Sequence, residues 1–353
     1  MKVEISGSGL IGTSMGLALH RVGHQIRFTD LVEENAVLAA ARIESAEFEG
    51  KADLFVSALP SDLVGEDISR AQKLNLAHMF IDVASIKTKV QQNVKSLGDE
   101  ISFCGTHPMA GSERSGPVAA RSDLFEGRAW VYTPSERTQN SLVEIVEEVI
   151  VECGALPIRM TPLEHDSAVA AVSHTPQVLA SLLASALSQV PQTHLAIAGS
   201  GLRDTIRIAG SDPVVWQPIL LGNREAIANF LEPIGKELNS FIDKLRKDQS
   251  FEPGELIERG ARGRAQLPGK HGERARRYDK IAVLLPDRPG QLGALFATFS
   301  TLQVNVEDIS MEHSPGLPSG LVEITIAPGT GSDLIASLSK SGWRAYAIAP
   351  DAN

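Results

Sequence analysis

Near its start the chain reads Val3-Glu4-Ile5-Ser6-Gly7-Ser8-Gly9-Leu10-Ile11-Gly12, a short β-rich run that leads into a Gly-x-Gly-x-x-Gly motif. Residues 13–22, which follow it, are typical of a helix. In a strand–turn–helix unit the first glycine permits a tight turn, and the second lets the backbone approach a pyrophosphate. The third glycine lets the helix pack closely on the sheet. The stretch therefore predicts a dinucleotide site at a helix N-terminus.

The acidic residue Asp30 ends the next β-rich run, 18 residues after Gly12. Its carboxylate can accept hydrogen bonds from a ribose 2′-hydroxyl and would repel a 2′-phosphate, and no Lys or Arg occurs in residues 31–34. We therefore expect NAD rather than NADP. The other interpretation is that Asp30 is a turn residue that caps the next helix. The residues expected to contact the cofactor are Gly7, Ser8, Gly9, Leu10, Ile11, Gly12, Asp30, Ala58, Leu59 and Pro60.

Short β-rich runs alternate with helical stretches throughout residues 1–161. Such alternation is typical of a parallel sheet wrapped by helices, so we expect a Rossmann-type, doubly wound α/β domain here. The expected strands are 3–6, 25–29, 53–59, 79–84, 101–105 and 129–133, and the clearest helices are 13–22 and 87–97.

Residues 162–258 have the period of helices and predict an all-α domain. The segment 168–187 is apolar on nearly every side, and a helix without a polar face needs cover on all sides. We expect that cover to come from a second copy in a homodimer. The apolar residues concerned are Val169, Val172, Leu179, Leu182, Leu183 and Leu187.

The segment 259–278 is rich in Lys, Arg and Gly, which favours an exposed linker. Residues 279–353 then read as strand, helix, strand, strand, helix, strand, the order of a ferredoxin-like βαββαβ domain. The expected elements are 280–285, 291–302, 305–312, 320–327, 333–341 and 344–348.

The composition is that of a soluble globular protein, with 43% hydrophobic and 22% charged residues. A net charge of -10 gives no reason to expect nucleic acid as a partner. The two cysteines, Cys104 and Cys153, have no metal-ligand spacing, so we expect no metal site and a reducing compartment. The sequence shows no signal peptide and no uncharged apolar run of about 18 residues, so we expect a cytoplasmic protein that does not span a membrane.

Two polar residues mark the carboxyl edge of the predicted sheet. Ser85 lies between the strand 79–84 and the helix 87–97, and His107 follows the next strand. Ligands of open α/β sheets bind at this edge. A histidine of near-neutral pKa can take the proton of an alcohol while its carbon gives a hydride to NAD. Taken alone, Ser85 is equally well explained as a helix N-cap and His107-Pro108 as a structural turn.

Several motifs in order resemble the prephenate and arogenate dehydrogenases of tyrosine biosynthesis. They are Asp82-x-x-Ser85-x-Lys87, Gly105-Thr106-His107-Pro108-Met109-Ala110-Gly111-Ser112-Glu113-Arg114-Ser115-Gly116, Ser173-His174-x-Pro176, and the run from Gly201-Leu202-Arg203-Asp204 through Arg207 to Trp216. The resemblance covers nearly the whole chain. It implies that His107 accepts the proton of the ring 4-hydroxyl, that Ser85 hydrogen-bonds the same region, and that Arg207 holds the ring carboxylate. From charge alone, Arg203 and Arg207 would be solvated charges one turn apart on a helix.

The same resemblance assigns further substrate-site residues. Glu113 and an Asp204 donated by the other subunit are expected to form an ionic gate with Arg207, and Trp216 is expected to be offered across the dimer. The match also places Gly201, Ser173 and His174 near the substrate. Gln177 departs from the pattern, because many relatives have a second histidine there beside the substrate side chain. Since an amide can both donate and accept, it fits prephenate or arogenate, and the choice stays open.

The C-terminal domain resembles the ACT modules that some family members carry after a Leu-Pro-Gly-Lys-x-Gly connector, here residues 267–272. ACT modules commonly bind amino acids between paired copies, which implies that L-tyrosine is an inhibitor of this chain. The other interpretation is a dimerisation module that has lost its ligand. The residues expected near the effector are Asp287, Arg288, Pro289, Gly290, Leu292, Asn305 and Val306.

Two rival interpretations remain. A β-hydroxyacid dehydrogenase also has a Rossmann domain followed by helices, but such enzymes usually rely on a lysine in the helical domain, and 168–187 contains none. A non-catalytic sensor of NAD and amino acids is the second rival, and Ser85, His107 and Arg207 argue against it.

Overall fold

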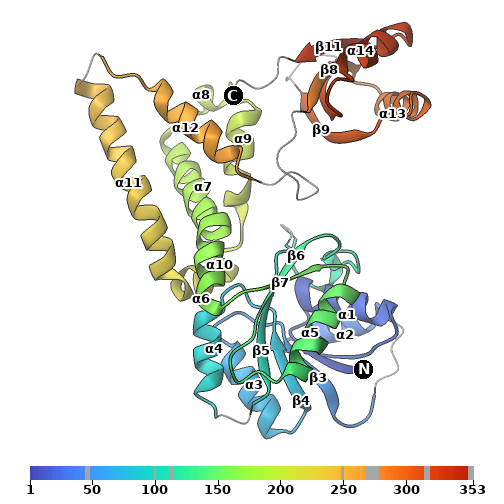
Figure 1. The fold of residues 1–353 in the computed structure, drawn as a ribbon, viewed down its shortest axis with the longest axis vertical. Helices are drawn as coiled ribbons and strands as arrows, with labels where there is room; N and C mark the ends of the chain where they lie inside the picture. The colour runs from blue at the N-terminus through green and yellow to red at the C-terminus, as the bar shows by residue number, and fades with distance from the viewer. Residues whose placement is uncertain are drawn as a thin grey trace. The chain divides into compact units, whose positions relative to one another are not determined.

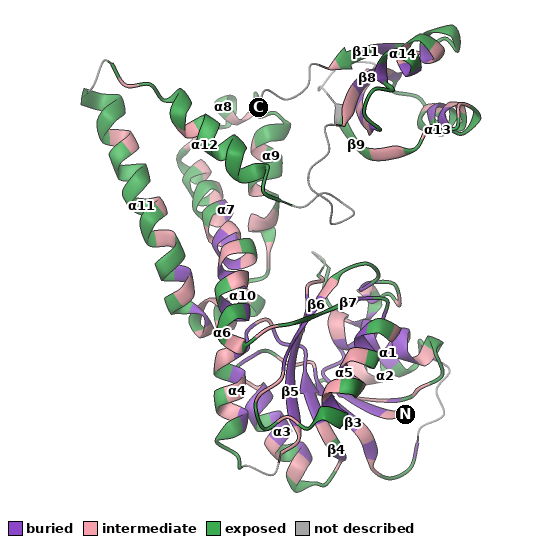
Figure 2. Cartoon of the chain, in the orientation of Figure 1, coloured by how far each residue is buried: buried purple, intermediate pink, exposed green. Residues whose placement is uncertain are grey.

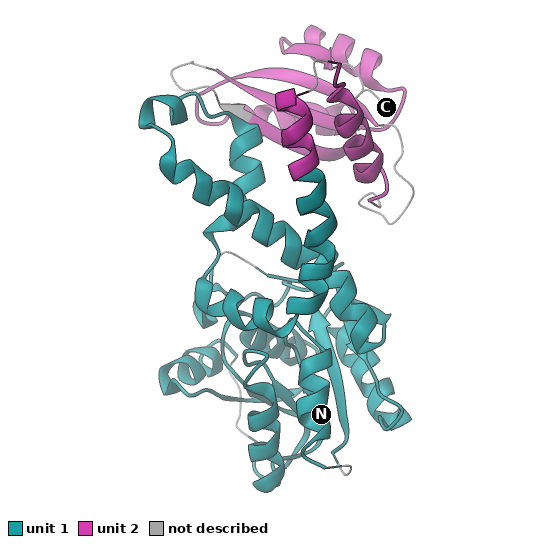
Figure 3. Cartoon of the chain, turned by 90° about the vertical axis from the view of Figure 1, so that its left-hand side faces the viewer, with its two compact units in different colours: residues 1–238 teal, residues 239–353 magenta. Residues whose placement is uncertain are grey.

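The computed structural model describes residues 1–43, 48–98, 101–111, 114–247, 250–267, 278–313 and 319–348. The chain divides into two compact units, Met1–Leu238 and Asn239–Asn353 (Figure 3).

A seven-stranded sheet forms the centre of the first unit, with the strand order β2-β1-β3-β4-β5-β6-β7 (Figure 1). The order reverses between β1 and β3, which is the point where open α/β sheets bind nucleotides. The strands are β1 (Lys2–Ser6), β2 (Gln25–Thr29), β3 (Ala52–Ser57), β4 (Ala77–Asp82), β5 (Phe103–Pro108), β6 (Ala129–Thr133) and β7 (Leu156–Arg159).

The sheet departs from the predicted parallel arrangement at one pair of strands, because β5 and β6 pair antiparallel. A parallel pair needs a crossover that returns the chain to the starting edge of the sheet, usually through a helix. The described residues of the loop between β5 and β6 contain only the short 3₁₀ helix η1 (Pro117–Ala119), and β6 starts from the edge where β5 ends. The chain then continues through α5 (Asn140–Glu152) to β7, which is parallel to β6 and was not predicted.

Helices cover both faces of this sheet, as expected of a doubly wound fold. Successive strand residues point to opposite faces. Leu54 and Val56 share a core with α1 (Leu10–Arg21) and α5, whereas Phe55 shares a core with α3 (Val64–Lys73) and α4 (Thr88–Lys95). The helix α2 (Glu33–Ala40) contacts β2.

Helices make up the rest of this unit from Pro162 onward. They are α6 (Pro162–Val169), α7 (Thr175–Ala186), η3 (Leu187–Gln189), α8 (Gln192–Leu195), α9 (Ser200–Ile206), η4 (Arg207–Gly210), α10 (Pro213–Gly222) and α11 (Arg224–Lys247), which runs into the second unit. A capping box of Thr161 and Glu164 starts α6. Between α6 and α7 a π-helical segment, η2 (Ala170–His174), precedes Pro176, whose ring nitrogen has no hydrogen to donate within a helix.

The apolar residues of these helices are only partly covered within one chain (Figure 2). Val169 is buried, but Val172 and Leu182 are 65% and 61% exposed, and Leu179 and Leu183 are also exposed. By length and composition alone, the helical run Pro162–Gln189 is apolar enough to cross a membrane.

The second unit contains a four-stranded antiparallel sheet in the order β11-β8-β10-β9. Its elements confirm the predicted strand–helix–strand–strand–helix–strand order. They are β8 (Asp279–Pro286), α13 (Gln291–Thr301), β9 (Val306–His313), β10 (Ser319–Ile326), α14 (Gly331–Lys340) and β11 (Arg344–Ile348). The helix α12 (Gly254–Arg264) includes the first residues of the predicted linker 259–278, of which residues 268–277 lie outside the described part.

Candidate active site

The glycine loop has the shape that a dinucleotide requires. Gly7 has a φ of +98°, and a Cβ atom there would lie 2.6 Å from the carbonyl oxygen of Ala58. A Cβ at Gly12 would clash with the carbonyl oxygen of Gly7, so α1 can pack this closely on the loop only because residue 12 is glycine. At Gly9, the N-cap of α1, a Cβ would meet nothing within 4 Å. The loop therefore leaves open space over a helix N-terminus, which fits the pyrophosphate of NAD.

Asp30 ties this loop to the end of β2. Its carboxylate accepts hydrogen bonds from the backbone N–H groups of Ser8, at 2.6 Å, and Val32, at 2.9 Å. The bond to Val32 is the turn contact of the alternative interpretation. Asp30 also lines a cleft of about 470 Å³, together with Leu59 and Arg70. The structure thus gives Asp30 a turn role and also places it at a cleft beside the glycine loop.

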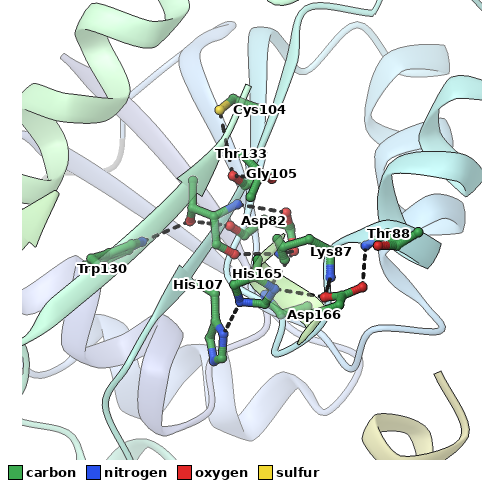
Figure 4. Close-up of polar contacts among 12 residues, drawn as sticks. Asp82, Lys87, Thr88, Cys104, Gly105, His107, Trp130, Thr133, His165 and Asp166 are labelled. Carbon is green, nitrogen blue, oxygen red and sulfur yellow. Dashed lines mark hydrogen bonds and ion pairs between the residues drawn. The ribbon is translucent and has the colours of Figure 1, made fainter. Parts of the chain in front are cut away.

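Residues of β5, α6 and the N-terminus of α4 form a continuous polar chain beside the predicted catalytic edge (Figure 4). His107 Nδ1 lies 2.8 Å from Nε2 of His165, and Nδ1 of His165 lies 2.8 Å from Oδ1 of Asp166. The Asp166 carboxylate also accepts the backbone N–H groups of Lys87 and Thr88, both at 2.8 Å. Asp166 therefore links the N-terminus of α4 to His165 and, through it, to His107.

A buried ion pair fixes the ends of β4 and β5 beneath this chain. The Lys87 ammonium bonds the Asp82 carboxylate and, at 2.6 Å, the carbonyl oxygen of Thr106. Asp82 in turn accepts the backbone N–H groups of Ala84 and Thr106. Burial lowers the pKa of Lys87 from its usual value, and the Asp82 carboxylate opposes that shift. These bonds set the position of His107, the residue after Thr106.

The electrostatic environment keeps the two linked imidazoles neutral. Burial, followed by the influence of His165 and Lys87, holds the pKa of His107 well below its usual value. Burial also lowers the pKa of His165, although Asp166 opposes that shift. Burial alone would raise the pKa of Asp166, but its hydrogen bonds lower it overall. His107 is therefore a neutral ring, able to accept a proton.

Ser85 lies in the bend between β4 and α4, at the edge where His107 lies. The helix α10 packs tightly on this bend, because a Cβ at Gly222 would clash with the side chain of Ile86. The helical part of the first unit therefore supports the loop that carries Ser85.

His174 joins the same region from the π-helical segment. The amide nitrogen of Asn223 lies 2.7 Å from the carbonyl oxygen of Asp166 and 3.1 Å from Nδ1 of His174. The rings of His174 and Trp216 meet edge to face, with centroids 6.0 Å apart. Trp216 thus contacts His174 of its own chain. Ser173, the residue before His174, is partly buried.

The other predicted substrate residues lie on α9, η4 and α7. Arg203 and Arg207 were expected one turn apart on the same helix. Instead α9, which contains Arg203, ends at Ile206, and Arg207 begins η4. Gly201 and Asp204 are exposed on α9. Glu113 lies outside the described residues. The buried Gln177 amide donates to the carbonyl oxygen of Ile208 at 2.9 Å, so it serves the turn that follows Arg207.

Sequence reasoning missed His165, Asp166 and Asn223. The available signal for His165 and Asp166 was a pair of adjacent polar residues just after the capping box that starts α6. Their partner His107 is 58 positions away from His165 in the sequence, so spacing gave no indication of the contact.

The predicted effector residues fall at two ends of the second sheet. Asp287, Arg288 and Pro289 follow β8, and Gly290 caps α13 with a φ of +86°. Ile326 of β10 pairs with both Asp279 and Val306, whereas Ser319 pairs with Pro286. Asn305 and Val306 therefore lie beside the start of β8, about 20 Å along the strands from the turn that contains Arg288.

Comparisons with known proteins agree with this geometry. Residues 15–158 match the family model of the prephenate dehydrogenase nucleotide-binding domain, and residues 161–258 match that of the prephenate dehydrogenase dimerization domain. A protein described as "Probable prephenate dehydrogenase NovF" of Streptomyces niveus is 32% identical over 97% of this chain and 98% of its own length. The prephenate dehydrogenase of Bacillus subtilis strain 168 is 28% identical over 92% of this chain and 91% of its own.

Two solved structures are similar to about three quarters of the chain. Prephenate dehydrogenase from A. aeolicus in complex with hydroxyphenyl propionate and NAD+ has a TM-score of 0.67 and 26% identity, over 75% of this chain and 97% of that one. Synechocystis arogenate dehydrogenase has a TM-score of 0.64 and 26% identity, over 75% and 99%. The two family models span more than half of the sequence, and the chain belongs to the prephenate dehydrogenase family.

Proposed function

We propose that the chain oxidises prephenate with NAD and releases carbon dioxide, which gives 4-hydroxyphenylpyruvate on the route to L-tyrosine. The observation that carries the proposal is the neutral His107 imidazole at the carboxyl edge of β5, in a family member with an intact glycine loop. Arogenate dehydrogenase, which forms L-tyrosine directly, is the second candidate, because a solved arogenate dehydrogenase is nearly as similar.

His107 supplies the proton chemistry of this reaction. NAD held over the glycine loop Gly7–Gly12 would supply the acceptor for a hydride from ring C4. As that hydride leaves, His107 takes the hydroxyl proton, a contribution of about 100-fold to 10,000-fold in rate. Ser85, at the same edge, orients the hydroxyl or the imidazole. The electrons of the bond to the departing carboxylate then flow into the ring, carbon dioxide is released, and aromatisation makes the reaction effectively one-way.

Arg207 binds and orients the ring carboxylate. A guanidinium presents a planar fork that matches a carboxylate in two-point contact. A strong pair also stabilises the carboxylate before it departs, so we assign Arg207 to orientation. The family resemblance adds an ionic gate of Glu113 and Asp204, and it places Gly201, Ser173, His174 and Trp216 around the substrate.

The chain works as a homodimer, with 1–161 binding NAD and 162–258 forming the interface. Exposed apolar side chains on α7 and η2, together with the match to a dimerization domain, support this proposal. A second copy covers these side chains, which also accounts for the long apolar run Pro162–Gln189 in a soluble biosynthetic enzyme. Sedimentation at micromolar concentration tests it, and a monomer would contradict it.

Residues 279–353 form an ACT domain that makes L-tyrosine an inhibitor. Its βαββαβ order and the turn Asp287–Gly290 support this. Because Arg288 and Asn305 lie at opposite ends of one sheet, a tyrosine that contacts both must lie between two copies. Asp287→Ala should therefore remove tyrosine inhibition and leave the uninhibited rate unchanged. Inhibition that survives both Asp287→Ala and Asn305→Ala would instead act at the active site.

One assay tests the reaction and its substrate. NADH absorbance is followed with prephenate and with arogenate, using NAD and then NADP. We expect turnover with prephenate and NAD, and Asp30→Ser should weaken the preference for NAD over NADP. Faster turnover with arogenate would select the second candidate, and no turnover with either substrate would favour a non-catalytic sensor.

A further inference from the structure

We infer that His165 is a positioning residue that fixes the tautomer of His107, so that Nε2 of His107 is the atom that accepts the substrate proton. The inference rests on the proposed function for its catalytic consequence. Its structural part concerns only the polar chain from Asp166 to His107 (Figure 4).

Asp166 sets the direction of the chain. Its carboxylate is 3% exposed and accepts the backbone N–H groups of Lys87 and Thr88. An ionised carboxylate has no hydrogen to donate. The His165 nitrogen that faces it, Nδ1, must therefore carry the hydrogen of that 2.8 Å bond. A neutral imidazole with a hydrogen on Nδ1 has only a lone pair on Nε2.

The lone pair of His165 then determines the state of His107. Nε2 of His165 can only accept, so Nδ1 of His107, 2.8 Å away, must donate. This leaves the lone pair of His107 on Nε2. In Figure 4 that end of the ring points away from the other labelled polar residues. The fully buried His165 thus holds the ring of His107 so that its basic nitrogen faces outward.

The same chain keeps the product of proton transfer hydrogen-bonded. When Nε2 of His107 takes the hydroxyl proton, the ring becomes a cation that still donates from Nδ1 to His165. Burial, His165, Lys87 and His174 oppose this positive charge, and His165 remains bonded to the Asp166 carboxylate. The Lys87 charge is offset by Asp82 beside it. His165 therefore gives the transient cation its only described path of hydrogen bonds to a carboxylate.

Two substitutions of His165 separate these roles. In His165→Gln, the amide reaches the place of Nε2 and supplies an oxygen that accepts from His107. In His165→Asn, the shorter amide reaches only the place of Nδ1, so His107 loses its acceptor. We expect kcat to fall about 100-fold or more in His165→Asn and about 10-fold or less in His165→Gln. The KM for prephenate and the KM for arogenate should change little. His78→Asn, at the exposed start of β4, is the matched control.

A spectroscopic readout keeps the inference independent of the reaction. ¹⁵N NMR of histidine-labelled full-length protein reports which ring nitrogen of His107 carries hydrogen, with His107→Asn used for assignment. We expect hydrogen on Nδ1 in the wild type and in His165→Gln, and a mixture of tautomers in His165→Asn. Hydrogen on Nε2 in the wild type, or equal kcat in the two His165 variants, would overturn the inference. A wild type that oxidises neither substrate but has hydrogen on Nδ1 would refute only the proposed function.

Discussion

Gln177 donates a hydrogen bond from its side-chain amide to the backbone carbonyl oxygen of Ile208, at 2.9 Å. Ile208 follows Arg207 in the 3₁₀ turn η4. The hydroxyl of Ser211, just after that turn, donates to the side-chain oxygen Oε1 of Gln177 and to the backbone carbonyl oxygen of Ile208. The amide that the sequence suggested for substrate recognition is thus bonded within the protein. It holds the turn that begins at the proposed carboxylate-binding arginine.

The contact predicts how a substitution of Gln177 affects two substrates. In Gln177→Leu the turn loses its tether, so KM should rise about 10-fold for prephenate and for arogenate alike. Steady-state kinetics with both substrates measures this. A rise in KM for only one of the two substrates would show that Gln177 contacts the side chain of the substrate instead.

Activity should persist at unusually low pH for an enzyme that depends on histidine. Burial, His165 and Lys87 hold the pKa of His107 well below its usual value of 6.5. The neutral ring accepts the proton, so activity is lost only when the pH falls through the lowered pKa. We expect kcat to stay level as the pH falls through 6.5 and to decrease only at lower pH. A decrease centred at pH 6.5 or above would contradict the neutral state of His107.

His174 should make folding stability depend on pH. Burial lowers its pKa from 6.5 to about 4. The unfolded chain therefore binds a proton at higher pH than the folded chain, so the stability contributed by neutral His174 is present above pH 6.5 and lost as pH falls towards 4. The loss should be about 1 to 3 kcal/mol in the free energy of unfolding.

Urea unfolding at pH 7 and at pH 4.5 measures this loss. The comparison is with His174→Asn, which cannot titrate in this range. The variant should lose less stability between the two pH values than the wild type does. An equal loss in both proteins would mean that His174 carries no part of the pH dependence.

Alanine substitutions at two glycines of the first loop should have different effects. In Gly9→Ala the new methyl group points into open space where the cofactor approaches, so the protein should fold normally and bind NAD about 10-fold more weakly or worse. In Gly12→Ala the methyl group clashes with the carbonyl oxygen of Gly7, so stability itself should fall, by about 1 to 3 kcal/mol. Thermal unfolding and NAD titration of both variants separate the two effects. Normal NAD binding by Gly9→Ala would mean that the pyrophosphate does not approach this glycine.

Local patterns were enough to predict most of the fold. Gly7 to Gly12, Asp30 and the alternating strands predicted the sheet and its nucleotide site, because these features depend on residues close in the sequence. The apolar segment around Leu182 correctly predicted that one chain alone leaves part of its apolar side chains exposed. The antiparallel β6 was missed because strand direction depends on the path of a loop rather than on strand composition.

The site was less predictable than the fold. Ser85 and His107 stood out because strand ends meet at one edge of a sheet. His165, Asp166 and Asn223 reach His107 and His174 only through packing of the helical segment on the sheet, which no local pattern encodes. Gln177 was identified by position, but its actual partner, a backbone carbonyl in a turn, leaves no mark on the sequence.

The most direct test compares wild type and His107→Asn in NADH formation from prephenate, with NAD binding measured in parallel. We predict rapid NADH formation by the wild type, a loss of about 100-fold to 10,000-fold in kcat for the variant, and equal NAD affinity in both. A His107→Asn variant that oxidises prephenate at the wild-type rate would contradict the role of this imidazole as the proton acceptor.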